Sequence, residues 1–220
     1  TSQGATTGTS GKQISMYLLP KQTGSSYFAT YAEGAQEAAK ELGDVNLTYD
    51  GPVSGDATEA AKLINQWTLK GADVIAVSVN DPAVLDQPMK AAMAKGVKVI
   101  TWDADAAPDT RILFVNQATA EQIGDKLVEA LAADIGGGDP SKASGEVAIV
   151  TATLTAANQN EWMKYMNEEL KKYPNLKLIE TEAADDNQNK AQQEADSLMS
   201  THPDLRGIWA ISAEACPSLA

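Results

Sequence analysis

Polar and aromatic side chains gather in a few short loops of this sequence. The set consists of Lys21, Tyr27, Phe28, Asp103, Asp105, Asn158, Gln159, Asn160, Trp162 and Glu214. Carboxylates and amides accept and donate several hydrogen bonds, and aromatic faces pack on the C–H surface of a sugar ring. Together these residue types predict a site that binds a small polyol.

Each of these residues also has a purely structural interpretation. Asp103 can be a solvated turn residue, and Tyr27 and Phe28 can anchor a core. Asn158 stands where it could cap the N-terminus of a helix, a position that favours Asn. The sequence leaves these alternatives open.

Enzymatic chemistry finds less support than binding. Asp103 and Asp105 could act as acid and base, but alternate residues project differently, and glycosidase carboxylates need a fixed separation across the substrate. The single histidine, His202, leaves no plausible Ser/His/Asp set. The chain has no GxxxxGK[ST] phosphate loop and no GxGxxG after a strand. We therefore expect no catalytic residues and no cofactor.

Composition narrows the class of partner. One cysteine, Cys216, excludes an intramolecular disulfide and a CxxC device, and with one histidine a metal site has little support. The net charge of −13 opposes the basic surface that nucleic acid binding requires. No apolar run approaches the about 18 to 20 residues that span a bilayer. These features predict a soluble, globular protein without a nucleic acid partner.

Apolar and helical patterns alternate from residue 13 onward. Strands are expected at 14–19, 46–49, 73–79 and 97–102, and helices at 27–42, 56–69 and 82–95. Alternation of this kind is typical of βαβ units with a parallel sheet. We predict the flavodoxin-like strand order 2-1-3-4, with the ligand beyond the carboxyl ends of the strands.

The same order starts again after the glycine-rich break at 136–140. Strands are expected at 146–151, 176–181 and 207–212, and helices at 158–172 and 187–200. The displacement is constant at about 130 residues, which indicates two copies of one architecture. The second copy stops after its third strand, so we expect the native protein to continue past Ala220 by about 80 to 100 residues.

These patterns divide the chain into four parts. Residues 1–12 are expected to form a flexible tether, 13–116 an N-terminal α/β lobe, 117–143 a crossover helix with a linker, and 144–220 a second, truncated α/β lobe. Many anchored lipoproteins have a Ser/Thr/Gly-rich stretch directly after their lipid-bearing cysteine, and the start of this chain is similar. Such a start is equally typical of a disordered terminus or a cloning remnant.

Five motifs carry a family resemblance. They are LLPKQTGSSYF at 18–28, YDGP at 49–52, AVSVNDP at 76–82, AMAKGVKVITWDAD at 92–105 and NQNEW at 158–162. In this order they resemble the autoinducer-2 and rhamnose-binding branch of the sugar-binding proteins of ABC importers. The resemblance implies the type 1 periplasmic binding fold, with two Rossmann-like lobes that close about a hinge.

The resemblance also implies site residues. It puts Lys21, Asp103, Asn158, Gln159 and Ala213 on ligand-contact positions, with Tyr27 and Phe28 in an aromatic loop. Autoinducer-2 receptors have Asp-Gln where this chain has Asn158-Gln159, and a proline where it has Ile211. The NQN form instead looks like the rhamnose binders.

The implied function is capture of a rhamnose-like deoxyhexose or a pentose for an ABC permease. The implied location is the periplasm or the outer face of the cytoplasmic membrane, with or without a lipid anchor, and we expect a monomer. An autoinducer-2 receptor for uptake or signalling is the alternative. The effector domain of a sugar-responsive regulator shares the fold, but the first twelve residues offer no basic helix-turn-helix.

Overall fold

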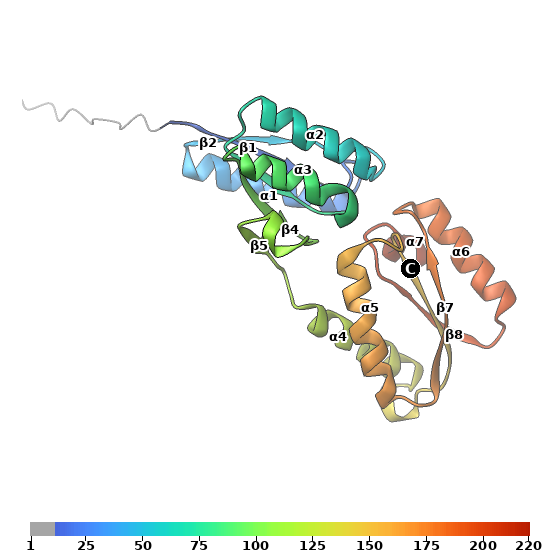
Figure 1. Ribbon diagram of the computed structural model, residues 1–220. Coiled ribbons are helices and arrows are strands. Elements are labelled where there is room, and N and C mark those ends of the chain that lie inside the picture. The colour runs from blue at the N-terminus through green and yellow to red at the C-terminus, as the bar shows by residue number, and fades with distance from the viewer. Residues whose placement is uncertain (1–11) are drawn as a thin grey trace, which may run out of the picture.

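The computed structural model describes residues 12–220, which form two α/β lobes joined by an extended segment (Figure 1). The tether expected at 1–12 lies, except for its last residue, outside the described part. Within residues 12–220, no helix has both the length and the hydropathy that a membrane crossing requires.

The first lobe is built on a parallel sheet with the order β2-β1-β3-β4-β5. Its strands are β1 (Ile14–Leu19), β2 (Val45–Tyr49), β3 (Val74–Val77), β4 (Lys98–Trp102) and β5 (Leu113–Val115). The predicted order of the first four strands is confirmed. The fifth strand was not predicted, because its three apolar residues are too short a run to distinguish from a loop.

Three helices cover this sheet: α1 (Ser26–Leu42), α2 (Ala57–Leu69) and α3 (Pro82–Ala94). The helices α2 and α3 pack over one face, where Ile64, Leu85 and Met89 are fully buried against β3. In the same cluster, Trp67 stacks on Tyr17 with ring centroids 4.7 Å apart. Burial of these large side chains, each contributing about 1.5 to 3 kcal/mol, therefore fixes the two helices on the sheet.

The second lobe repeats the start of the first. Its parallel sheet has the order β7-β6-β8, with β6 (Gly145–Thr151), β7 (Leu176–Ala183) and β8 (Leu205–Ala210). The first strand of the copy lies in the middle, as β1 does between β2 and β3, which confirms the repeat. The helices are α5 (Ala157–Glu169), α6 (Gln188–Thr201) and α7 (Ala215–Leu219).

Short 3₁₀ turns complete the chain at Pro108–Thr110, Pro140–Lys142 and Leu170–Lys172. The last of these follows α5 directly, so the helix expected to reach residue 172 is α-helical only as far as Glu169.

The segment 117–143 contains the helix α4 (Ala120–Ile135), which packs on the second sheet. Val128 and Ala132 are fully buried there against Val147 and Ile149. The helix crosses α5 very closely at Gly124, where an added Cβ would lie 2.7 Å from the Trp162 carbonyl oxygen. Only a glycine allows the two backbones to approach in this way.

This close approach can be tested by the substitution Gly124→Ala. Alanine favours a helix over glycine, but here its Cβ must displace the α5 backbone, so we expect the free energy of unfolding to fall by about 1 to 3 kcal/mol. The matched control is Gly34→Ala in α1, where nothing lies within 4 Å of the added Cβ. That variant should gain about 0.5 to 1 kcal/mol. Urea denaturation measures both; a stabilised Gly124→Ala would contradict the packing.

Candidate functional site

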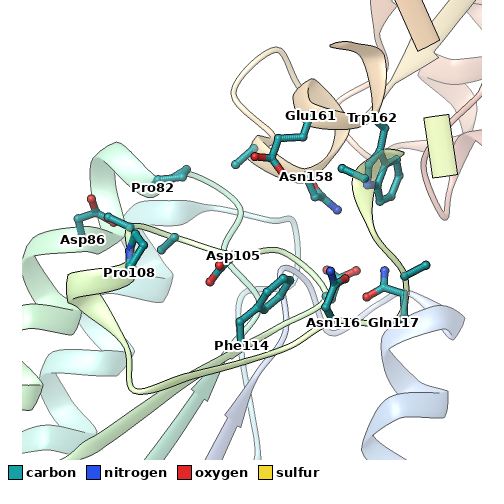
Figure 2. A pocket seen from close by; sticks show the side chains of 16 residues that line it. Pro82, Asp86, Asp105, Pro108, Phe114, Asn116, Gln117, Asn158, Glu161 and Trp162 are labelled. Atoms are coloured by element: carbon teal, nitrogen blue, oxygen red, sulfur yellow. The ribbon is translucent and has the colours of Figure 1, made fainter. Parts of the chain in front are cut away.

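Segments that follow strands of both lobes meet between the lobes, where Lys21, after β1, contacts Asn158, after β6. A cavity of about 420 Å³ lies there. Figure 2 shows Asp105 and Phe114 on the first-lobe side, and Asn158, Glu161 and Trp162 of α5 across from them. Asn116 and Gln117, from the segment that connects the lobes, also line the cavity. It therefore takes its walls from both lobes and from the connection.

Lys21 joins the lobes at one side of this cavity. Its side chain is only 7% exposed, although lysine is rarely buried in proteins unless it is paired. Its Nζ donates to Asn158 Oδ1 of the second lobe at 3.1 Å and lies 3.8 Å from Asp103 Oδ2 of the first. A second hydrogen bond between the lobes, from Gln22 Nε2 to the carbonyl oxygen of Asp186, is 3.4 Å long.

The loop that carries Lys21 is held by the loop after β2. The amide of Thr23 donates to the carbonyl oxygen of Pro52 at 2.8 Å. A Cβ on Gly51 would lie 2.9 Å from Pro20 Cδ, so the two loops can meet only because residue 51 is glycine. The YDGP motif thus positions the lysine without lining the cavity.

Asp103 occupies a strained turn directly after β4. Its φ is 60°, and the amide of Ala104 donates to the Trp102 carbonyl oxygen at 2.6 Å, which makes a γ-turn centred on the aspartate. Tyr27 Oη donates to its Oδ1 at 2.9 Å and Ser78 Oγ to its Oδ2 at 2.6 Å. The residue is 7% exposed, so the interpretation of Asp103 as a solvated turn residue is wrong.

The two aromatic residues at the start of α1 have different environments. Phe28 is 3% exposed and packs edge-on against Trp102, with ring centroids 5.8 Å apart, so it anchors the core. The hydroxyl of Tyr27 points to Asp103, to which it donates a hydrogen bond. Burial and the nearby charge of Asp103 raise the pKa of Tyr27, so the phenol stays neutral and remains a donor.

Asp105 lines the cavity, but its oxygens are already engaged. Arg111 binds it in a bidentate pair, from Nε to Oδ1 at 2.7 Å and from Nη2 to Oδ2 at 2.6 Å, and Thr101 also donates to it. Burial would raise the pKa of Asp105, but the hydrogen bonds from Arg111 and Thr101 outweigh it and lower that pKa. The arginine also lies 5.8 Å from the centroid of Phe114. Sequence reasoning missed Arg111.

The start of α5 supplies four of the predicted residues, of which Asn160 donates from Nδ2 to the carbonyl oxygen of Leu154 at 2.9 Å. The helix begins at Ala157 after Ala156, so Asn158 is not its N-cap, and that alternative is wrong. Gln159 is buried, and its Oε1 accepts from the amide of Ala152 at 2.7 Å and from Thr151 Oγ1, which ties α5 to the end of β6. Trp162 lines the cavity one turn after Asn158.

The loops after β7 and β8 contain Asp186 and Ala213, respectively. Ala213 is exposed in the turn between β8 and α7, and it is not among the residues that line the cavity. Asp186, in the loop after β7, was missed. It lies near Lys21 and Ser212, and burial raises its pKa, whereas Lys21 and Ser212 lower it. The rule that ligand loops follow strands could have found it, because its loop comes directly after the strand predicted at 176–181.

The assembled site contains a buried ammonium, carboxylate acceptors and amides, which suits a neutral ligand with several hydroxyl groups. Across residues 12–220, no cluster of three or more His, Cys, Asp or Glu side chains has the arrangement of a metal site.

Comparison with known proteins identifies the family that has this architecture. A family model described as "Periplasmic binding protein domain" matches residues 16–220. A curated relative, the D-apiose import binding protein of Paraburkholderia graminis, is 22% identical over 210 residues that cover 93% of this chain and 63% of the relative.

Solved structures agree. LsrB from Clostridium saccharobutylicum in complex with AI-2 is 28% identical, with a TM-score of 0.88, and the match covers 93% of this chain and 64% of LsrB. A solute-binding protein from Clostridium phytofermentas with bound L-rhamnose is 27% identical, with a TM-score of 0.87 and coverage of 96% and 64%. The chain thus spans less than two thirds of these relatives. It belongs to the periplasmic binding protein family and has the α/β fold with parallel sheets that its motifs predicted.

Proposed function

We propose that this protein is the extracytoplasmic solute-binding component of an ABC importer and captures a small neutral sugar between its two lobes. The contact of Lys21 with Asp103 of one lobe and Asn158 of the other is the observation that carries the proposal. It puts polar groups from both lobes at the edge of one cavity, which is what capture by closure requires.

The size and lining of the cavity support a monosaccharide. Its volume of about 420 Å³ is near the lower end of the about 300 to 1,000 Å³ typical of small-molecule sites. Phe114 and Trp162 provide apolar surface for the C–H face of a ring, and Asn116 and Asn158 provide amides for its hydroxyls. No step of bond making or breaking is part of the proposal.

The choice of sugar turns on Asn158. Because its Oδ1 accepts from Lys21, its Nδ2 is left to donate to a ligand. An ionised carboxylate at the same position could only accept. A sugar that must be given a hydrogen bond, at its ring oxygen or at a hydroxyl lone pair, therefore suits the amide. We rank a rhamnose-like deoxyhexose or a pentose first, in keeping with the relatives that bind D-apiose and L-rhamnose.

An autoinducer-2 receptor for uptake or signalling is the second candidate. The similarity to LsrB in complex with AI-2 favours it. Either ligand would be delivered to an ABC permease by a monomeric binding protein, located in the periplasm or at the outer face of the cytoplasmic membrane, with or without a lipid anchor.

The role of Asp103 is tested with Asp103→Asn in the purified protein. Asparagine tolerates the positive φ, so the turn should survive, but the charge-assisted hydrogen bonds to ligand hydroxyls are lost. We expect calorimetric affinity for the best-bound of L-rhamnose, D-arabinose, D-ribose and D-xylose to fall about tenfold or more. The control is Asp109→Asn, an exposed carboxylate paired with Lys90 outside the site. Equal affinity in both variants would place the ligand elsewhere.

Ligand choice is tested with Asn158→Asp. The carboxylate removes a donor, so we expect sugar affinity to fall about five- to hundredfold, while autoinducer-2 affinity is kept or improved. Asn167→Asp, on an exposed part of the same helix, is the matched control. Calorimetric titration of the sugars and of autoinducer-2 into each protein measures these affinities. Tight autoinducer-2 binding by the unmodified protein, with no response to the four sugars, would overturn the ranking.

A further inference from the structure

Two consecutive aspartates shape the loop between β7 and α6. Asp185 and Asp186 have φ values of 50° and 48°, a left-handed conformation that is unfavourable for most residues and that Asp and Asn tolerate best. The turn sends the two side chains to different environments. Asp185 is 65% exposed and pairs with Lys190 at 2.7 Å, whereas Asp186 is directed inward.

One oxygen of the Asp186 carboxylate is left without a donor. This atom, Oδ1, is buried and has no hydrogen-bond partner within the described part of the chain. Buried polar atoms in native proteins are nearly always paired, and an unpaired carboxylate oxygen is costly. The unpaired Oδ1 therefore calls for a donor that residues 12–220 do not supply.

The charged groups around Asp186 explain why its Oδ1 lacks a donor. Lys21 of the first lobe is the cation that acts on it, but the Lys21 ammonium already donates to Asn158 and lies beside Asp103. Asp103 and Glu214 add negative charge to the surroundings of Asp186. None of the donors in the described part of the chain reaches Asp186 Oδ1, and a ligand hydroxyl could donate to it.

We propose that Asp186 is a specificity-determining residue that accepts a hydrogen bond from one hydroxyl of the captured sugar. This inference rests on the proposed function. It gives the second lobe a carboxylate near Lys21, as Asp103 is in the first lobe, and it assigns Lys21 to hold both in place.

The test compares Asp186→Asn with Asp185→Asn. Both substitutions keep a residue that tolerates the left-handed turn, and both remove one charge from the same loop. Asp185 is the exposed residue of the two, paired with Lys190, so it serves as the control. We expect Asp186→Asn to lose about tenfold or more in calorimetric affinity for the best-bound of L-rhamnose, D-arabinose, D-ribose and D-xylose, and Asp185→Asn to bind normally. The monodeoxy analogue that lacks the contacted hydroxyl should bind equally to the unmodified protein and to Asp186→Asn.

Equal binding of the intact sugar by the unmodified protein and Asp186→Asn would overturn the inference and leave the proposed function standing. The inference would also be overturned if Asp186→Asn lowered the affinity for every monodeoxy analogue as much as it lowered the affinity for the intact sugar. If the unmodified protein bound none of the four sugars, the proposed function and the inference would both fall.

A second readout needs no ligand. When folding raises the pKa of a carboxyl group, the group favours the folded state at pH values below its ordinary pKa. This contribution to stability is lost as the pH rises through the raised pKa. Lys21, Asp103, Ser212 and Glu214 face this group and are unchanged in the variant. Ligand-free Asp186→Asn should therefore melt above the unmodified protein at neutral pH, with the difference shrinking in acid. A lower melting temperature at neutral pH would show that Asp186 is already satisfied, and the inference would be wrong.

Discussion

The site depends on one buried lysine ammonium that lies between the lobes. Lys21 is almost fully buried, and a buried charge is tolerated only when it is paired and hydrogen-bonded. Neither lobe alone satisfies it: Asp103 comes from the first lobe and Asn158 from the second. The ammonium thus couples the position of the lobes to the polar groups of the cavity, which is the link between structure and the proposed capture.

The sheets act as a rigid scaffold, and the strain is confined to their ends. Asp103 and Asp186 both have positive φ in turns that directly follow strands. Such conformations cost about 1 to 3 kcal/mol each and persist where the surroundings fix them, often at functional sites. Here the buried strands β4 and β6 and the close crossing of α4 over α5 provide that rigidity. Both strained turns bring a carboxylate toward Lys21.

Much of the fold could be predicted because parallel strands buried on both faces leave continuous apolar runs, as in 73–79 and 146–151. The loops of the site followed from the same strands. The contacts that these loop residues make with other side chains could not be predicted. Whether Asp105 faces a ligand depends on Arg111, six residues away. Whether Phe28, in α1, faces the cavity depends on its packing against Trp102 of β4. Contacts of this kind arise from tertiary approach, which spacing along one sequence does not encode.

The most direct test of the central claim is ligand-induced closure in solution, compared between the unmodified protein and Lys21→Met. Methionine keeps an unbranched apolar stem of similar length but has no charge to join the lobes. Small-angle X-ray scattering with and without the best-bound sugar of the panel measures the change. We expect the radius of gyration of the unmodified protein to decrease on sugar addition and that of Lys21→Met to stay unchanged. Equal compaction of both proteins at saturating sugar would contradict the account.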